Sequence, residues 1–263
     1  MHKPWSEPPL FEGPTYRYTF DAPLLEDAED TNPLALAWRT PRGGTGAADR
    51  VLLQRMVLPP ERERLQRALE ELWLHTRLRH PHILSVLDVE EFQGEVYVVL
   101  EHAPGLFLGT ALELALLRGH RLSPRLCVYT AAAVADALHA AWTCEDAHGQ
   151  PLRIVHRAVS PRTIRLGLDG GVRLTDFGVA HAARAERLAT TSSRLRADLA
   201  QAAPEVLRQG PVDGRADVYS LGLLAYEMVT GQTAFKGSYE AVVHQQVFES
   251  PKPPKQVKME VPG

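Results

Sequence analysis

Lysine is almost missing from this sequence. None occurs between Lys3 and Lys236, so arginine carries nearly all of the positive charge over that stretch. Asparagine is rarer still, with Asn32 as its single occurrence. These absences exclude a phosphate site held by lysine in residues 4–235, and they exclude an asparagine ligand for a metal ion anywhere after residue 32.

Cysteine and long apolar runs are also scarce. The only cysteines, Cys127 and Cys144, lie seventeen positions apart on one predicted helix, too far to bridge within it. We therefore expect two reduced thiols in a cytoplasmic protein. No run is apolar enough to span a bilayer, and the N-terminus lacks the apolar region of a signal peptide. The net charge of −3 gives no reason to expect attraction to nucleic acid or to bulk membrane.

The most informative stretch, residues 153–178, reads RIVHRAVSPRTIRLGLDGGVRLTDFG. In it His156-Arg157 follows a short predicted strand, and Asp176-Phe177-Gly178 follows two more. This layout resembles the catalytic loop and DFG segment of the eukaryotic-like serine/threonine protein kinases found in bacteria. In that family the residue after His-Arg is the aspartate that accepts the proton of the substrate hydroxyl. Here that residue is Ala158, and a methyl group cannot accept a proton.

Other motifs follow in the order and spacing of the family over residues 16–250. Glu71 matches the glutamate of the regulatory helix, and its alternative is a solvated helix-face carboxylate. The segment Glu101, His102, Ala103 resembles the hinge, Glu205 closes an Ala-Pro-Glu motif, and Asp217 opens an apolar helix. In the family, the counterpart of Glu205 pairs with an arginine beyond the region that this sequence covers, so we expect no such partner for it.

The resemblance implies an α+β, two-lobed protein-kinase-like fold. We expect a flexible arm over residues 1–14, a kinase-like domain over 15–250 and a proline-rich tail over 251–263. Within the domain we expect a small β-rich N-lobe at 15–101 and a helical C-lobe at 102–250. Similar kinases continue for several more helices, so the C-lobe is expected to be truncated. At 263 residues and 44% hydrophobic content, the chain is long enough to bury the core of this domain.

The positions that would hold nucleotide in the family are altered. The stretch between the first two predicted strands, residues 21–30, contains no glycine and carries five carboxylates, so it opposes a triphosphate. Gln54 occupies the position of the phosphate-binding lysine. Leu52 replaces the small residue above the adenine, and Arg165 replaces the aliphatic residue below it. We expect these two side chains to occlude the pocket.

The metal-binding positions are altered in part. Asp176 remains, but Thr163 stands at the position of the metal-binding asparagine. One carboxylate and one hydroxyl make a weak magnesium site. Asp176-Phe177-Gly178 has a structural alternative, with Phe177 as a core residue touching His156 and Gly178 providing backbone freedom. We therefore expect no metal, and no binding of ATP with magnesium.

The sequence predicts a pseudokinase: a regulatory or scaffold module that binds another protein, such as a signalling protein or an active kinase, without phosphotransfer. Self-association through the truncated C-lobe is a further expectation. The alternative is a weak or atypical ATP-dependent serine/threonine kinase, or another nucleotide-dependent transferase, that uses Asp176 and Asp198 as a displaced base. We expect no nucleic-acid partner.

Overall fold

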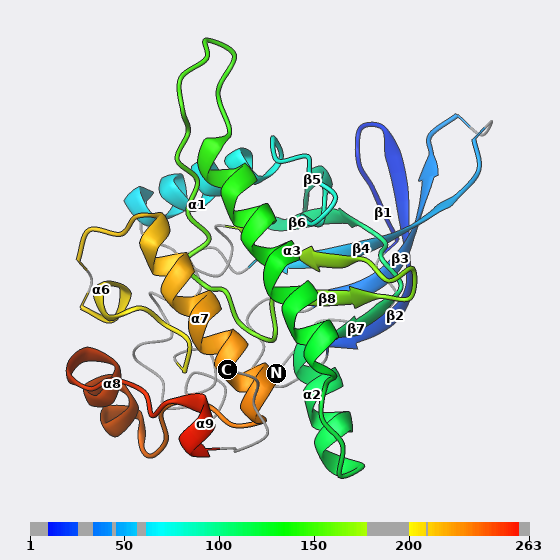
Figure 1. Cartoon of the computed structure of the whole chain (residues 1–263). Helices are drawn as coiled ribbons and strands as arrows, with labels where there is room; N and C mark the ends of the chain where they lie inside the picture. Colours follow the sequence, from blue (N-terminus) through cyan, green and yellow to red (C-terminus); the bar gives the residue numbers. More distant parts are fainter. Residues whose placement is uncertain are drawn as a thin grey trace. The chain divides into compact units, whose positions relative to one another are not determined.

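The computed structural model describes residues 10–25, 34–43, 46–56, 62–177, 200–208 and 210–257. The chain forms two compact units. The first comprises Met1–Leu78 and Leu84–Ala103, and the second comprises Arg79–Ile83 and Pro104–Gly263. Figure 1 traces the chain and labels the elements of both units. The architecture is that of a protein-kinase-like α+β fold, with a β-rich first unit and a mainly helical second unit.

The first unit is an antiparallel sheet of six strands with one helix. The strand order is β1-β2-β3-β4-β6-β5. The bounds are β1 Leu10–Glu12, β2 Tyr16–Leu25, β3 Leu34–Pro41, β4 Asp49–Met56, β5 Val86–Phe92 and β6 Glu95–Glu101, with helix α1 at Arg62–His75 between β4 and β5. Because side chains alternate between the faces of a strand, every second residue of β2, β3, β4 and β6 faces the same core.

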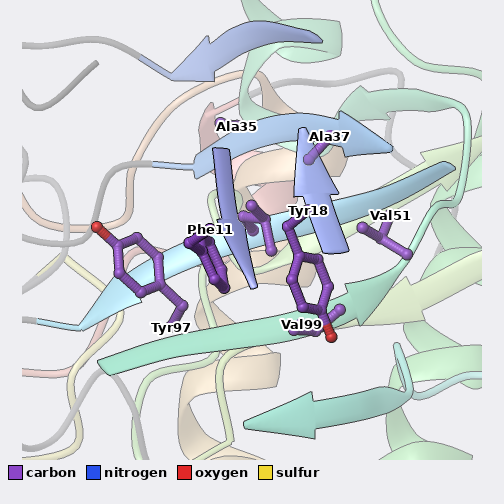
Figure 2. Packing of buried hydrophobic residues seen from close by; sticks show 8 residues of the cluster. Phe11, Tyr18, Ala35, Ala37, Val51, Tyr97 and Val99 are labelled. Atoms are coloured by element: carbon purple, nitrogen blue, oxygen red, sulfur yellow. The ribbon is translucent and has the colours of Figure 1, made fainter. Parts of the chain in front are cut away.

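An apolar cluster fills one face of this sheet, and Figure 2 shows it from close by. Its buried members are Phe11, Tyr18, Ala35, Ala37, Val51, Leu53, Tyr97 and Val99. Phe11 lies at the centre of the aromatic members, with its ring centroid 4.8 Å from that of Tyr18 and 5.2 Å from that of Phe92. Phe11 is on the first strand of the sheet and Phe92 is on the last. The sheet therefore curls until residues of its two edge strands touch.

Residues 10–12 correct the expectation of a flexible arm over residues 1–14. They pair with β2 in the register Leu10↔Thr19, Phe11↔Tyr18 and Glu12↔Arg17. The physical reason is the burial of Phe11, which is only 1% exposed and gives this short strand an apolar anchor. Residues 1–9, the acidic stretch 26–30 and residues 258–263 of the proline-rich tail lie outside the described residues.

The second unit consists of helices around a three-stranded sheet of order β7-β8-β9. The strands are β7 Gly105–Phe107, β8 Ile164–Gly167 and β9 Val172–Leu174, and the helices are α2 Leu108–Leu117, α3 Pro124–Thr143, α6 Pro204–Leu207, α7 Gly214–Thr230, α8 Tyr239–Phe248 and α9 Pro254–Val257. Ser123 caps the start of α3 by accepting a hydrogen bond from the Leu126 amide at 3.3 Å. Helix α9 falls within the expected tail.

Helices α3 and α7 pack against each other in the second unit. The sequence predicts that α7 is apolar and buried around most of its circumference. Leu223, Leu224 and Met228 are buried, as expected, but Val218 is 67% exposed. One side of α7 is therefore uncovered by the described residues. None of the helices in the described part of the chain is long and apolar enough to cross a membrane.

Replacement of Phe11 tests whether β1 belongs to the core. We expect Phe11→Ala to lower the free energy of unfolding of the first unit by about 3–5 kcal/mol, because it removes a buried ring from between Tyr18 and Phe92. Chemical denaturation followed by circular dichroism measures this change. Leu116→Ala is the control, since Leu116 is 71% exposed and its loss should cost less than about 0.5 kcal/mol. Equal effects of the two substitutions would contradict a core role for Phe11.

Candidate functional site

His156 joins the two motifs that suggested the site. Its imidazole is fully buried, and its Nε2 lies 2.6 Å from the carbonyl oxygen of Thr175. Its Nδ1 lies 3.2 Å from the amide nitrogen of Ala158, which donates to it. These two contacts fit a neutral ring with its proton on Nε2. The ring also packs edge-on against Phe177, with centroids 4.6 Å apart, so the loop and the Asp-Phe-Gly segment touch as the structural alternative requires.

Asp217, near the start of α7, holds the backbone of the same loop. One carboxylate oxygen accepts a hydrogen bond from the His156 amide and the other accepts from the Arg157 amide, each at 2.7 Å. Burial raises the pKa of Asp217 to about 6, while the two amide hydrogen bonds and the charge of Arg157 act in the opposite direction. The carboxylate therefore satisfies two amides that would otherwise be buried without acceptors.

Two residues of the site adopt left-handed backbone conformations that are uncommon without glycine. Arg157 has a φ of 65° and Asp176 has a φ of 66°. Such residues each cost on the order of 1–3 kcal/mol and cluster at functional sites. Asp217 holds the amide of Arg157, and the hydroxyl of Thr175 lies 3.1 Å from a carboxylate oxygen of Asp176 and can donate to it.

Thr163 closes the loop around Ala158. Its hydroxyl accepts a hydrogen bond from the Ser160 amide at 3.1 Å. The same hydroxyl has a choice of two acceptors for its proton, the carbonyl oxygens of Ala158 at 3.2 Å and of Ser160 at 3.1 Å. Thr163 is thus part of the internal scaffold of the loop, with one oxygen lone pair already used. The methyl group of Ala158 is buried within this loop.

Arg165 on β8 is only 4% exposed, which is unusual for an arginine. One guanidinium nitrogen donates to the carbonyl oxygen of Gly105 at 3.2 Å, and the group lies over the ring of Phe107 at 4.8 Å from its centroid. Burial lowers the pKa of Arg165, and the like charge of Arg173 adds to that effect. The side chain therefore packs onto strand β7 within its own unit.

The candidate residues of the first unit lie on β4 and at the end of β6. Leu52 is fully buried and lies opposite Leu36 and Leu100 in the sheet. Gln54 points to the same face as Leu52 and is also buried. Glu101, His102 and Ala103 follow in sequence at the end of the unit, where the Glu101 amide donates to the carbonyl oxygen of Ser85.

Comparison with known proteins agrees with this arrangement. The sequence model of the protein kinase domain matches residues 51–262. The chain belongs to the protein kinase domain family.

Bacterial protein kinases are among its relatives. The chain is 28% identical over 223 residues to the tyrosine-protein kinase MasK of Myxococcus xanthus, covering 84% of this chain and 34% of MasK. It is 35% identical over 190 residues to the serine/threonine-protein kinase PknJ of Mycobacterium tuberculosis, covering 71% of this chain and 30% of PknJ. The chain thus spans about a third of the length of these relatives.

Solved structures show the same fold. The crystal structure of the Mycobacterium tuberculosis PknI kinase domain matches 96% of this chain and 85% of its own, with a TM-score of 0.67 at 24% identity. At that identity the likeness establishes the kinase fold alone.

Of the remaining predicted site residues, some lie on other elements and some fall outside the described part of the chain. Glu71 lies on α1, and its side chain is outside the described set, as are Gly178 and Asp198. Glu205 lies on α6, where its charge adds to the effect of Asp213 in raising the pKa of Arg215. Arg215 is therefore a nearby cation that the sequence analysis did not foresee for Glu205.

Sequence reasoning also missed the role of Thr175. Its amide donates to the Thr163 carbonyl oxygen at 2.8 Å, and its own carbonyl lies against His156. Its hydroxyl reaches both the Thr163 carbonyl and Asp176. The one available signal was its position directly before Asp-Phe-Gly.

The pH dependence of stability tests whether the carboxyl group of Asp217 holds the loop at His156 and Arg157. A carboxyl whose pKa is raised on folding stabilises the fold below its unfolded value near 3.8, and that contribution is lost as pH rises through about 6. We expect the free energy of unfolding of Asp217→Asn, relative to that of the parent, to rise between pH 4 and pH 7 by up to roughly 3 kcal/mol. The reason is that only the parent has a titrating carboxyl group at position 217. Urea denaturation at both pH values measures this difference. A pH-independent difference would contradict the raised pKa.

Proposed function

We propose that this protein kinase domain does not transfer phosphate and instead acts by binding another protein, as a regulatory or scaffold module in signalling. The observation that carries the proposal is Ala158. It stands where the family has its catalytic aspartate, and it is buried in a loop closed by the hydroxyl of Thr163. The loss of a positioned general base alone lowers a rate by about 10²–10⁴-fold.

The residues present also fit poorly to ATP and magnesium. Gln54 carries no charge to neutralise a phosphate, and no lysine stands between residues 4 and 235 to replace it. Of the two metal-binding positions, Asp176 offers a carboxylate, but Thr163 already uses its hydroxyl to close the loop. Among the described residues, no group of three or more His, Cys, Asp or Glu is placed to hold a metal ion. A lone carboxylate is a weak magnesium site.

What the loop retains is its scaffold. His156, Asp217 and Phe177 fix the backbone through hydrogen bonds and packing that need no nucleotide. The residues that shape the loop are retained, whereas the position of the catalytic aspartate holds Ala158. This pattern favours a protein whose function depends on the shape of the loop. A binding role uses shape directly, and the exposed Val218 on α7 is one place where a partner, or a second copy, would find apolar surface.

The alternative is a weak or atypical ATP-dependent kinase or another nucleotide-dependent transferase. The names of the relatives favour it, since MasK and PknJ are both kinases. The left-handed conformation of Asp176 favours it as well, because such strain is often kept for function. In this alternative Asp176 would orient the metal-bound phosphates and Asp198 would act as a displaced base.

Thermal denaturation with ATP and magnesium separates the two proposals. We expect no saturable rise in melting temperature up to 5 mM nucleotide. A ligand present at about one hundred times its dissociation constant would add about 2.7 kcal/mol of stability, so binding would be readily seen. A protein kinase that binds ATP, measured in parallel, is the positive control, and it should show the rise in melting temperature.

Transfer of radiolabel from γ-³²P-ATP tests the chemistry itself. We expect no labelling of the chain or of a general acceptor such as myelin basic protein, because the proton acceptor is missing. Labelling by the parent protein that disappears in Asp176→Asn would overturn the proposal and establish the transferase alternative.

A further inference from the structure

Residues 10–13, which we call the strap, run along one edge of the curled sheet in the first unit. The strap consists of β1 and Gly13, whose amide donates to the carbonyl oxygen of Tyr16 at 2.8 Å. Arg42, the residue that directly follows β3, donates a hydrogen bond from its guanidinium group to the Gly13 carbonyl oxygen at 3.0 Å. The strap is therefore attached by three pairs with β2, by Arg42 and by the buried ring of Phe11.

A carboxyl group lies directly beneath this strap. Glu90 on β5 is only 4% exposed, and it accepts a hydrogen bond from the Tyr18 hydroxyl at 3.1 Å. A Cβ atom added to Gly13 would collide with this carboxyl group. Glycine at position 13 is therefore what allows the strap to close over Glu90.

The charges around Glu90 do not favour its ionised form. Asp88 on the same strand is the nearby charge that acts on it, and it is negative. Tyr18, from β2, stays protonated because burial and the charge of Glu90 raise its pKa. Burial is the largest cause that raises the pKa of Glu90, Asp88 adds to it, and the hydrogen bond from Tyr18 opposes it.

The basic groups on the neighbouring elements bind other partners. Arg17 and Arg42 bind Glu12 of the strap, Arg39 on β3 binds Asp49 and lies over Tyr16, and Arg55 on β4 binds Glu95 of β6. Tyr97, opposite Glu90 on β6, directs its hydroxyl to Glu95.

We propose that Glu90 makes the strap a proton-sensitive latch, closed while this carboxyl is protonated and loosened when it ionises. An ionised carboxylate needs hydration or a cation, and the strap covers the side from which water would reach it. The strap pairs with the sheet through the three residues of β1. Opening would uncover the aromatic side chains that surround Phe11, among them Phe92 and Tyr97.

The direction of the pH effect follows from linkage. A carboxyl whose pKa is raised in the closed state stabilises that state at low pH, and the contribution is lost as pH rises through the raised value. For one proton, the population of the open strap can grow by at most about tenfold per pH unit.

Hydrogen exchange of the strap amides measures the opening. The exchange rate of a peptide covering residues 10–16 is divided by its intrinsic rate at each pH from 5 to 8. We expect this ratio to rise with pH in the parent protein, by no more than about tenfold per pH unit, and to stay flat in Glu90→Gln. The ratio for residues 95–101 of β6 should stay constant in both.

Glu91→Gln is the matched control, because Glu91 is the exposed neighbour on the same strand and its substitution removes the same charge. It should keep the pH response of the parent. A flat response in the parent, or the same response in Glu90→Gln, would overturn the latch.

Tyr18→Phe supplies a second and independent test that preserves the shape of the ring. It removes the hydrogen bond that favours the ionised form of Glu90. We therefore expect the midpoint of strap opening to move to higher pH. An unchanged midpoint, or one moved to lower pH, would show that Glu90 does not control the strap.

Discussion

The two hydrogen bonds that the amides of His156 and Arg157 donate to the carboxylate of Asp217 are the constraint on which the loop of the second unit depends. They hold Arg157 in a left-handed conformation that the chain would otherwise avoid. With the backbone fixed there, His156 can reach the Thr175 carbonyl and the Phe177 ring. The loop and the Asp-Phe-Gly segment, 19 residues apart at His156 and Thr175, are thereby joined through one buried imidazole.

The same geometry explains how this loop keeps its shape with alanine at position 158. The hydrogen bonds that shape it run between backbone groups and the side chains of Asp217, His156 and Thr163. None of them requires an aspartate at position 158, and the small Ala158 fits the buried space. The shape of the loop is thus independent of a carboxylate at position 158. The buried Arg165, bonded to Gly105 and stacked on Phe107, is a second replacement that the scaffold absorbs.

In the first unit the main constraint is the edge of the curled sheet, which β1 forms beside β2. An edge strand exposes unpaired backbone groups and invites association with other chains. Here β1 covers that edge beside β2 and inserts Phe11 among Tyr18, Phe92 and Tyr97. The closure also buries Glu90 under Gly13, so the apolar gain from Phe11 comes with a polar cost at Glu90. That conflict is the physical origin of the latch.

The sequence by itself determined the protein kinase family and its α+β fold, because these depend on local motifs and spacing. Only the tertiary structure decided that Phe11 is a core residue, that Thr163 is part of the loop scaffold and that Val218 is exposed. Each of these depends on what lies beside the residue in space, and the partners of Phe11 on β5 and β6 are about eighty positions away.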